Sequence, residues 1–242
     1  PSQDIDLDPM SRGRLVHKIL ELCLQDPKRS VDDFLVDEWI EKAREQEDIV
    51  VYSPALWDFH KKQIKGLVGN FLLLEREVKE KFPMRKPLSL EQEIKSHVSV
   101  CSEGLQFDPK GEVPFFGKID RIDHDGAGQI LIVDYKTSLS GLLAAGSWGK
   151  VGQMQLALYT LALMDGAYGG ERKNVVGAFY YGLKDKIQGQ GFVTKEVSTE
   201  FAQATRGLDQ KKLNQWVLQW RETLGQALEQ MKKGVFNPNP LD

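Results

Sequence analysis

The sequence predicts an α/β fold, in which a mixed β-sheet is flanked by helices and preceded by a helical N-terminal part. Three observations predict it. Helical periodicity comes first in the chain, strand-like segments follow, and a helical segment then separates a β-hairpin from a further apolar strand, as in a crossover connection. We expect the helical part over residues 1–85 and the sheet-containing core over residues 86–242, together forming one compact domain.

The N-terminal part is expected to consist of helices. Residues 14–24 and residues 31–47 both place apolar side chains at helical spacing. Ser53 and Pro54 form an N-cap followed by a proline at the first helical position, and they open a long helix that ends near Pro83.

The core combines strands with two further helices. Short strands are expected over residues 90–100 and 103–107, a hairpin over 113–123 and 129–136, and later strands over 174–183 and 191–197. The continuous apolar run 130–133 is typical of a strand covered on both faces, and the last strand is expected at a sheet edge. Helices are expected over residues 153–164 and from Asp209 to a stop at Gly234.

The hairpin carries two acidic residues that its register brings together. Asp120 and Asp134 are equidistant from position 127, inside a turn marked by Asp125-Gly126, so regular antiparallel pairing sets them opposite each other. Opposed residues have Cβ atoms roughly 4.5–5.5 Å apart, where two carboxylates repel unless one is protonated or a cation binds between them. Lys136 lies two residues beyond Asp134 and therefore shares its face of the strand.

Composition limits the classes of function. The chain is 41% hydrophobic and 28% charged, with no apolar run of membrane-spanning length and no signal-peptide pattern, so we expect a cytoplasmic protein with no membrane contact. The net charge of −3 gives no overall sign of nucleic-acid binding, although bound cations would offset acidic site residues. Cys23 and Cys101 are too few for a four-thiolate metal site. The chain begins at Pro1 without a methionine, which is compatible with a fragment of a longer protein.

Several motifs together resemble the RecB-like branch of the PD-(D/E)xK nuclease superfamily, which contains AddB- and RecB-type exonucleases. They occur in the family's order and span residues 13–159. The matching residues are Gly13 and His17; Gly117, Asp120 and Arg121; Asp134, Tyr135, Lys136 and Thr137; and Gln155 and Tyr159. The resemblance implies a restriction-endonuclease-like core with a mixed sheet flanked by helices.

The resemblance also implies a metal site. Asp120 and Asp134 would bind Mg²⁺ or Mn²⁺ through carboxylate oxygens, and His17 would be a further ligand through its imidazole. Tyr135 points away from the acidic face, so its side chain is expected to be packed while its backbone carbonyl is the implied ligand. Lys136 would orient or deprotonate the attacking water, or stabilise charge on the scissile phosphate.

Other motif residues are expected to support the site. Gln155 and Tyr159 lie four residues apart on one helix face, near the substrate or the catalytic groups. Arg121 alternates away from Asp120 and is expected to form a structural ion pair or to brace the site. A supporting glutamate is expected on the preceding strand, where Glu93 is the candidate and Glu91 its neighbour.

The motifs favour a metal-dependent DNA nuclease, an exonuclease of DNA repair and recombination that contacts the DNA backbone with little sequence specificity. The alternative is a catalytically silent nuclease-like module that binds DNA or serves as a scaffold in a helicase–nuclease complex. Loss of Asp120, Asp134 or Lys136 would mark that alternative, and all are present. The chain has no phosphate-binding Gly-rich loop, so a helicase partner would lie outside it.

Overall fold

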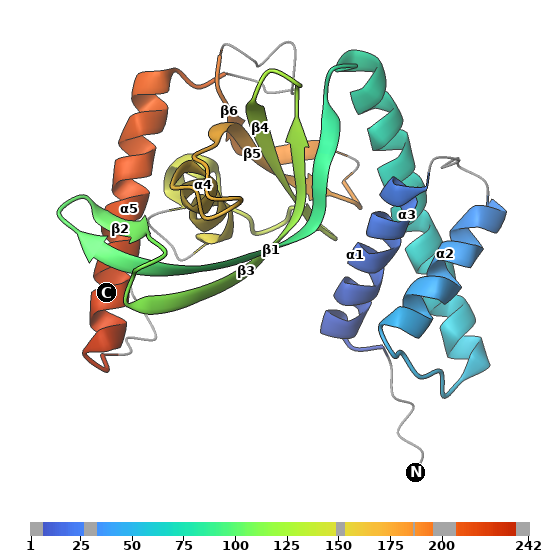
Figure 1. Ribbon diagram of the computed structural model, residues 1–242. Helices are drawn as coiled ribbons and strands as arrows, with labels where there is room; N and C mark the ends of the chain where they lie inside the picture. The colour runs from blue at the N-terminus through green and yellow to red at the C-terminus, as the bar shows by residue number, and fades with distance from the viewer. Residues whose placement is uncertain (1–6, 27–32, 149–152, 186, 196–206, 236–242) are drawn as a thin grey trace. The chain divides into compact units, whose positions relative to one another are not determined.

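The computed structural model describes residues 7–26, 33–148, 153–185, 187–195 and 207–235 (Figure 1). The chain divides into two compact units. The first, here called the helical unit, consists of Pro1–Glu80 with Tyr135–Ser138 and Gly182–Ile187. The second, the sheet unit, consists of Lys81–Asp134, Leu139–Tyr181 and Gln188–Asp242.

The helical unit contains the predicted helices as α1 (Pro9–Gln25), α2 (Asp33–Gln46) and α3 (Pro54–Lys81). Helix α1 begins five residues earlier than expected, because the Asp8 side chain accepts hydrogen bonds from the backbone N–H groups of Met10 and Ser11. The Ser53 hydroxyl caps α3 by accepting from Leu56 N at 3.4 Å, which confirms the predicted start of that helix.

Apolar faces pack these helices together. Buried side chains recur every three or four residues along α3, as expected for a helix with one face in a core. The buried residues of α1 and α3 include Leu15, Ile19, Cys23, Ile64, Val68 and Phe71. An ion pair of 2.7 Å between Lys65 Nζ and Asp37 Oδ2 joins α3 to α2 at the half-exposed margin of this packing.

The sheet unit is built on a mixed six-stranded sheet in the order β2-β1-β3-β4-β5-β6. The strands are β1 (Lys86–Cys101), β2 (Gly104–Phe107), β3 (Val113–His124), β4 (Gln129–Lys136), β5 (Asn174–Gly182) and β6 (Ile187–Val193). Strand β1 pairs antiparallel with both β2 and β3, and β3 pairs antiparallel with β4. The predicted α/β class and mixed sheet are confirmed, with β6 at the expected edge.

The β3–β4 hairpin has the register that the sequence predicts. Its pairs run from His124 opposite Ile130 to Arg121 opposite Val133. Gly126 and Gly128 have φ angles of 84° and 93°, and the Asp125 carboxylate closes the turn by accepting from Ala127 N and Gln129 N. Because glycine adopts positive φ without steric cost, this turn holds the two strands in one register.

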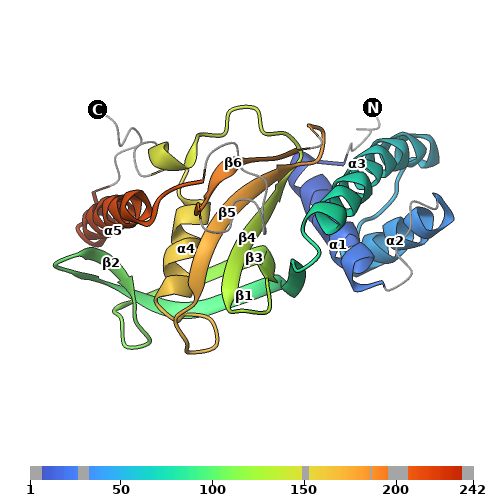
Figure 2. The ribbon, with the colours of Figure 1, turned by 90° about the horizontal axis from the view of Figure 1, so that it is seen from above.

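Two helices cover the sheet unit. Helix α4 (Gln155–Met164) is buried on nearly all sides, whereas α5 (Gln210–Lys232) is amphipathic and packs on β2, β1 and α4 (Figures 1 and 2). Asp209 caps α5 by accepting from Lys212 N, and Gly234 follows its end with a φ of 70°, as predicted. No helix in the described ranges is long and apolar enough to cross a bilayer.

A buried ionic cluster joins the start of β1 to β3 and β5. Asp123 is fully buried and accepts from Arg121 Nε at 2.5 Å and from Arg85 Nε at 2.6 Å. Arg85 also donates to the Tyr181 hydroxyl at 2.8 Å. Arg121 therefore forms the structural ion pair expected of it. Burial alone would raise the pKa of Asp123, but the two guanidinium groups outweigh burial and hold that pKa below its ordinary value.

Replacing Asp123 with asparagine is expected to lower the free energy of unfolding by about 3–5 kcal/mol, because two buried guanidinium groups lose their anionic partner. Urea unfolding at neutral pH measures this loss. Glu171→Gln is the control, since Glu171 is exposed and its pair with Lys173 should contribute less than about 1 kcal/mol. Equal losses in both variants would contradict the importance assigned to the cluster.

The same carboxylate predicts a dependence of stability on acid. The pKa of Asp123 is lower in the folded protein than in the unfolded chain, so its stabilisation is complete above the unfolded value and is lost as pH falls through the folded value. Urea unfolding should be measured at neutral pH and again below 3.8, the ordinary pKa of aspartate. Between these two conditions the free energy of unfolding should fall further for the wild-type protein than for Asp123→Asn. Parallel losses in the two proteins would show that other groups control acid unfolding.

Candidate active site

The hairpin places the two predicted acidic residues together. Asp120 and Asp134 occupy the opposed positions that follow Arg121 and Val133 in the β3–β4 register. Their side chains are 6% and 1% exposed, which is unusual for carboxylates. Both carboxylates also act electrostatically on Tyr159, whose pKa they help to raise. Two carboxylates withdrawn from solvent on facing strands form a centre of negative charge within the sheet unit.

A third carboxylate, from Glu91 on β1, joins this centre. Leu90 pairs with Arg121 and Gln92 with Ile119, which sets Glu91 opposite Asp120. One carboxylate oxygen of Glu91 lies within 4.8 Å of one of Asp120. Glu91 has a φ of 48°, a conformation that is uncommon for residues other than glycine and that concentrates at functional sites.

The structure brings Glu91, rather than the expected Glu93, beside Asp120. The Glu93 side chain is 62% exposed and pairs with Lys95 at 2.5 Å, whereas that of Glu91 is 13% exposed and pairs with Lys118. The two glutamates share one face of β1 by their spacing, so the strand period does not distinguish them. Only the pairing of β1 with β3 identifies the residue that faces Asp120.

Helix α4 contributes the residues of the last motif. The Tyr159 hydroxyl accepts from Gln155 Nε2 at 3.4 Å and from the backbone N–H of Lys118. Burial is the main cause that raises the pKa of Tyr159, so its hydroxyl stays protonated and can donate a hydrogen bond. These contacts tie α4 to β3 at the level of the acidic residues.

Gly117 permits the close approach of α4 to β3. A Cβ atom at this position would lie 3.1 Å from Cε1 of Tyr159 and 3.0 Å from two ring carbons of Phe115. These separations are tighter than ordinary van der Waals contacts, so a larger residue would push the Tyr159 ring away. The glycine of the motif therefore has a packing role at the tyrosine.

The Asp134-Tyr135-Lys136 motif occupies the end of β4. The Tyr135 side chain is buried in the helical unit, with its ring edge-on to those of Phe71 and His17 at centroid distances of 5.6 and 6.0 Å. This confirms that the Tyr135 side chain is packed. Lys136 is half-buried, and its backbone carbonyl accepts from Leu183 N at 2.9 Å, which anchors the strand end.

The donor atoms of the sheet unit suit a hard cation. Asp120, Asp134 and Glu91 offer only carboxylate oxygens, which Mg²⁺ and similar ions prefer to nitrogen or sulfur. A divalent ion would offset the repulsion between buried carboxylates. The residues present therefore fit a divalent metal. His17 lies on α1 in the helical unit, half-buried beside Tyr135.

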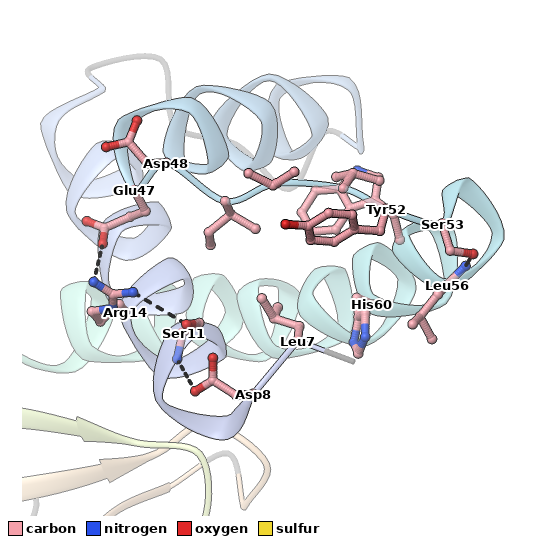
Figure 3. A pocket seen from close by; sticks show the side chains of 14 residues that line it. Leu7, Asp8, Ser11, Arg14, Glu47, Asp48, Tyr52, Ser53, Leu56 and His60 are labelled. Carbon is pink, nitrogen blue, oxygen red and sulfur yellow. Dashed lines mark hydrogen bonds and ion pairs between the residues drawn. The ribbon is translucent and has the colours of Figure 1, made fainter. Parts of the chain in front are cut away.

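The helical unit also contains a pocket of about 270 Å³ between the start of α1, the α2–α3 connection and the start of α3 (Figure 3). Asp8 and Ser11 lie at one end, and Arg14 faces Glu47 across the opening with a closest N–O distance of 4.0 Å. Tyr52 and His60 form part of its wall. The predicted catalytic and metal-binding residues are not among those that line this pocket.

Comparison with known families agrees with this geometry. The family model of the PD-(D/E)XK nuclease superfamily matches residues 1–242, the full length of the sequence. A search of curated proteins found no match. The proteins of this superfamily are nucleases that use divalent metals. The chain belongs to the PD-(D/E)XK nuclease superfamily.

Proposed function

We propose that this protein is a Mg²⁺- or Mn²⁺-dependent exodeoxyribonuclease of the RecB-like branch that acts in DNA repair and recombination. The observation that carries the proposal is the pair of buried, opposed carboxylates of Asp120 and Asp134, with Lys136 two residues further along the same strand. All of these groups are intact, which argues against the catalytically silent module.

The metal would be held by Asp120 and Asp134, with Glu91 beside Asp120 in the sheet unit. The motif resemblance adds the imidazole of His17 and the backbone carbonyl of Tyr135 to the proposed ligands. When bound, the cation would polarise a phosphodiester oxygen and lower the pKa of a water molecule. The carboxylates would contribute by fixing its position between facing strands, which are more rigid than a loop.

Lys136 would act directly on the reacting groups. It lies two residues beyond Asp134 on the strand, so strand alternation would direct its ammonium to the Asp134 face, where it would donate hydrogen bonds to the attacking water or to the scissile phosphate. Tyr159 and Gln155 would position these groups, since the protonated Tyr159 hydroxyl lies within the electrostatic reach of both aspartates. Hydrolysis then needs only in-line attack by water, with no covalent enzyme intermediate.

The biological setting is proposed from the same motifs. DNA would be bound through its backbone with little sequence preference, as befits an enzyme that degrades strands from their ends. A helicase domain or subunit outside this sequence would separate the strands, because no phosphate-binding loop is present to couple ATP hydrolysis to movement. We place this activity in the cytoplasm.

The first test is cleavage of end-labelled linear DNA and of closed circular DNA with Mg²⁺ or Mn²⁺. Linear DNA should be degraded and circles should survive, and a chelator should abolish the activity. Asp120→Asn and Asp134→Asn should remove activity because the cation loses ligands, while Lys136→Ala should lower the rate about 10²- to 10⁴-fold.

Asp108→Asn and Lys110→Ala in the turn between β2 and β3 are matched controls and should retain activity. Cleavage of circles would change the assignment to an endonuclease. DNA binding without cleavage by the wild-type protein would favour the silent module. Cleavage that is retained in Asp134→Asn would contradict the proposed active site.

The assignment of the supporting glutamate has its own test. Glu91→Gln should raise the Mg²⁺ concentration needed for half-maximal activity about 10- to 100-fold, whereas Glu93→Gln should leave it nearly unchanged. Lys118→Gln separates the loss of the Glu91 ion pair from the loss of the carboxylate itself. Equal effects of the two glutamate variants would contradict the role given to Glu91.

A further inference from the structure

Strands β1 and β3 form a long antiparallel ribbon with two different faces. The inner face carries Ile94, Val98 and Ile119, which belong to the same hydrophobic core as the buried side of α4 (Figure 1). Residues two apart on a strand share a face, so Phe116 and Lys118 of β3 lie with Glu93 and Lys95 of β1 on the outer face. This outer face reaches the acidic centre at Glu91, which pairs with Lys118 and has a carboxylate oxygen within 4.8 Å of one of Asp120.

Phe116 stands on that outer face. It lies four residues before Asp120 on β3, which corresponds to roughly 13 Å along an extended strand. Its side chain is 72% exposed, although Phe115 beside it turns inward and packs against Phe107 at a centroid distance of 4.9 Å. A single exposed apolar side chain is common on protein surfaces, so the exposure of Phe116 gains meaning only from the charged residues around it.

Lysines flank the ring along the ribbon. Lys95 is directly opposite Phe116, and Lys118 lies two residues from it toward Asp120. Their side chains are 67% and 56% exposed, and each has a glutamate partner on β1. The Lys95–Glu93 pair is exposed at both ends and therefore weak, so the Lys95 ammonium can exchange its carboxylate for a phosphate at little cost, and the half-exposed Lys118 presents a second cation to solvent. The outer face thus offers an aromatic surface between two cations.

We propose that this outer face is a stacking platform for the single-stranded end of the substrate, with a base on Phe116 and neighbouring phosphates at Lys95 and Lys118. The proposal rests on the proposed nuclease function and adds the form of its substrate. Aromatic rings flanked by cations bind unpaired bases of any sequence, while a base inside a duplex exposes no face for stacking. The platform therefore selects single strands and leads them to Asp120.

The test is equilibrium binding of a fluorescent single-stranded oligonucleotide and of the corresponding blunt duplex, followed by anisotropy. Ca²⁺ replaces Mg²⁺, and every protein also carries Lys136→Ala so that no strand is cut. Phe116→Ala should weaken single-strand binding roughly 5- to 150-fold and leave duplex binding nearly unchanged. Phe116→Trp should restore it, because stacking needs an aromatic ring rather than phenylalanine itself.

Two further variants sharpen the result. Phe59→Ala removes another exposed phenylalanine, 56% accessible on α3, and should not change binding. Lys95→Gln should reduce the slope of log affinity against log salt by about 0.7, the value for one phosphate contact with a single strand. Thermal unfolding of each variant establishes that the fold is retained.

The platform is overturned if Phe116→Ala binds single strands as wild type does, or if it weakens duplex binding to the same extent. That failure is distinct from failure of the proposed activity. If the wild-type protein cleaves DNA with metal but Phe116→Ala does not change binding, the platform is contradicted and the nuclease activity is supported. If Phe116→Ala weakens only single-strand binding but the wild-type protein cleaves no DNA, the platform is supported and the nuclease activity is contradicted.

Discussion

The β3–β4 register is the constraint on which the rest of the site depends. Continued one residue beyond the pair of Arg121 and Val133, it sets Asp120 opposite Asp134, and the packing around the sheet withdraws both carboxylates from water. Neither strand can move the charges apart without changing the register of the whole hairpin, which would turn core residues outward. A divalent cation bound at these residues would offset their charge and would stabilise the arrangement of the two strands.

The surrounding structure holds this charged pair in place from several directions. The buried cluster of Arg85, Asp123 and Arg121 fixes β3 directly beside Asp120, because Arg121 is the next residue of the strand. The cluster also ties β3 to the residue that precedes β1. On the other flank, Gly117 lets Tyr159 of α4 approach β3 closely enough to bond the backbone of Lys118. Rigid support of this kind keeps catalytic groups in position without help from the substrate.

The long β1–β3 ribbon connects the acidic centre to a solvent-exposed surface. One face of the ribbon contributes to the core with α4, and the other carries Phe116, Lys95 and Lys118, the last of which pairs with Glu91 beside Asp120. A strand is well suited to this task because alternate side chains keep a constant direction over many residues. The same alternation therefore allows one pair of strands to stabilise the protein, hold the proposed metal ligands and guide a polymer toward them.

Local patterns in the sequence determined the helix starts at Ser53 and Asp209, the stop at Gly234 and the register of the β3–β4 hairpin, because caps, turns and strand pairing across a short loop depend on nearby residues. They also determined the separation of Arg121 and Tyr135 from the acidic face. Only the tertiary structure decided that Glu91 rather than Glu93 faces Asp120, that Arg85 pairs with Asp123, and that Phe116 is exposed while Phe115 is buried. These outcomes depend on contacts between segments distant in the chain and on what each face of the sheet packs against, which local periodicity does not encode.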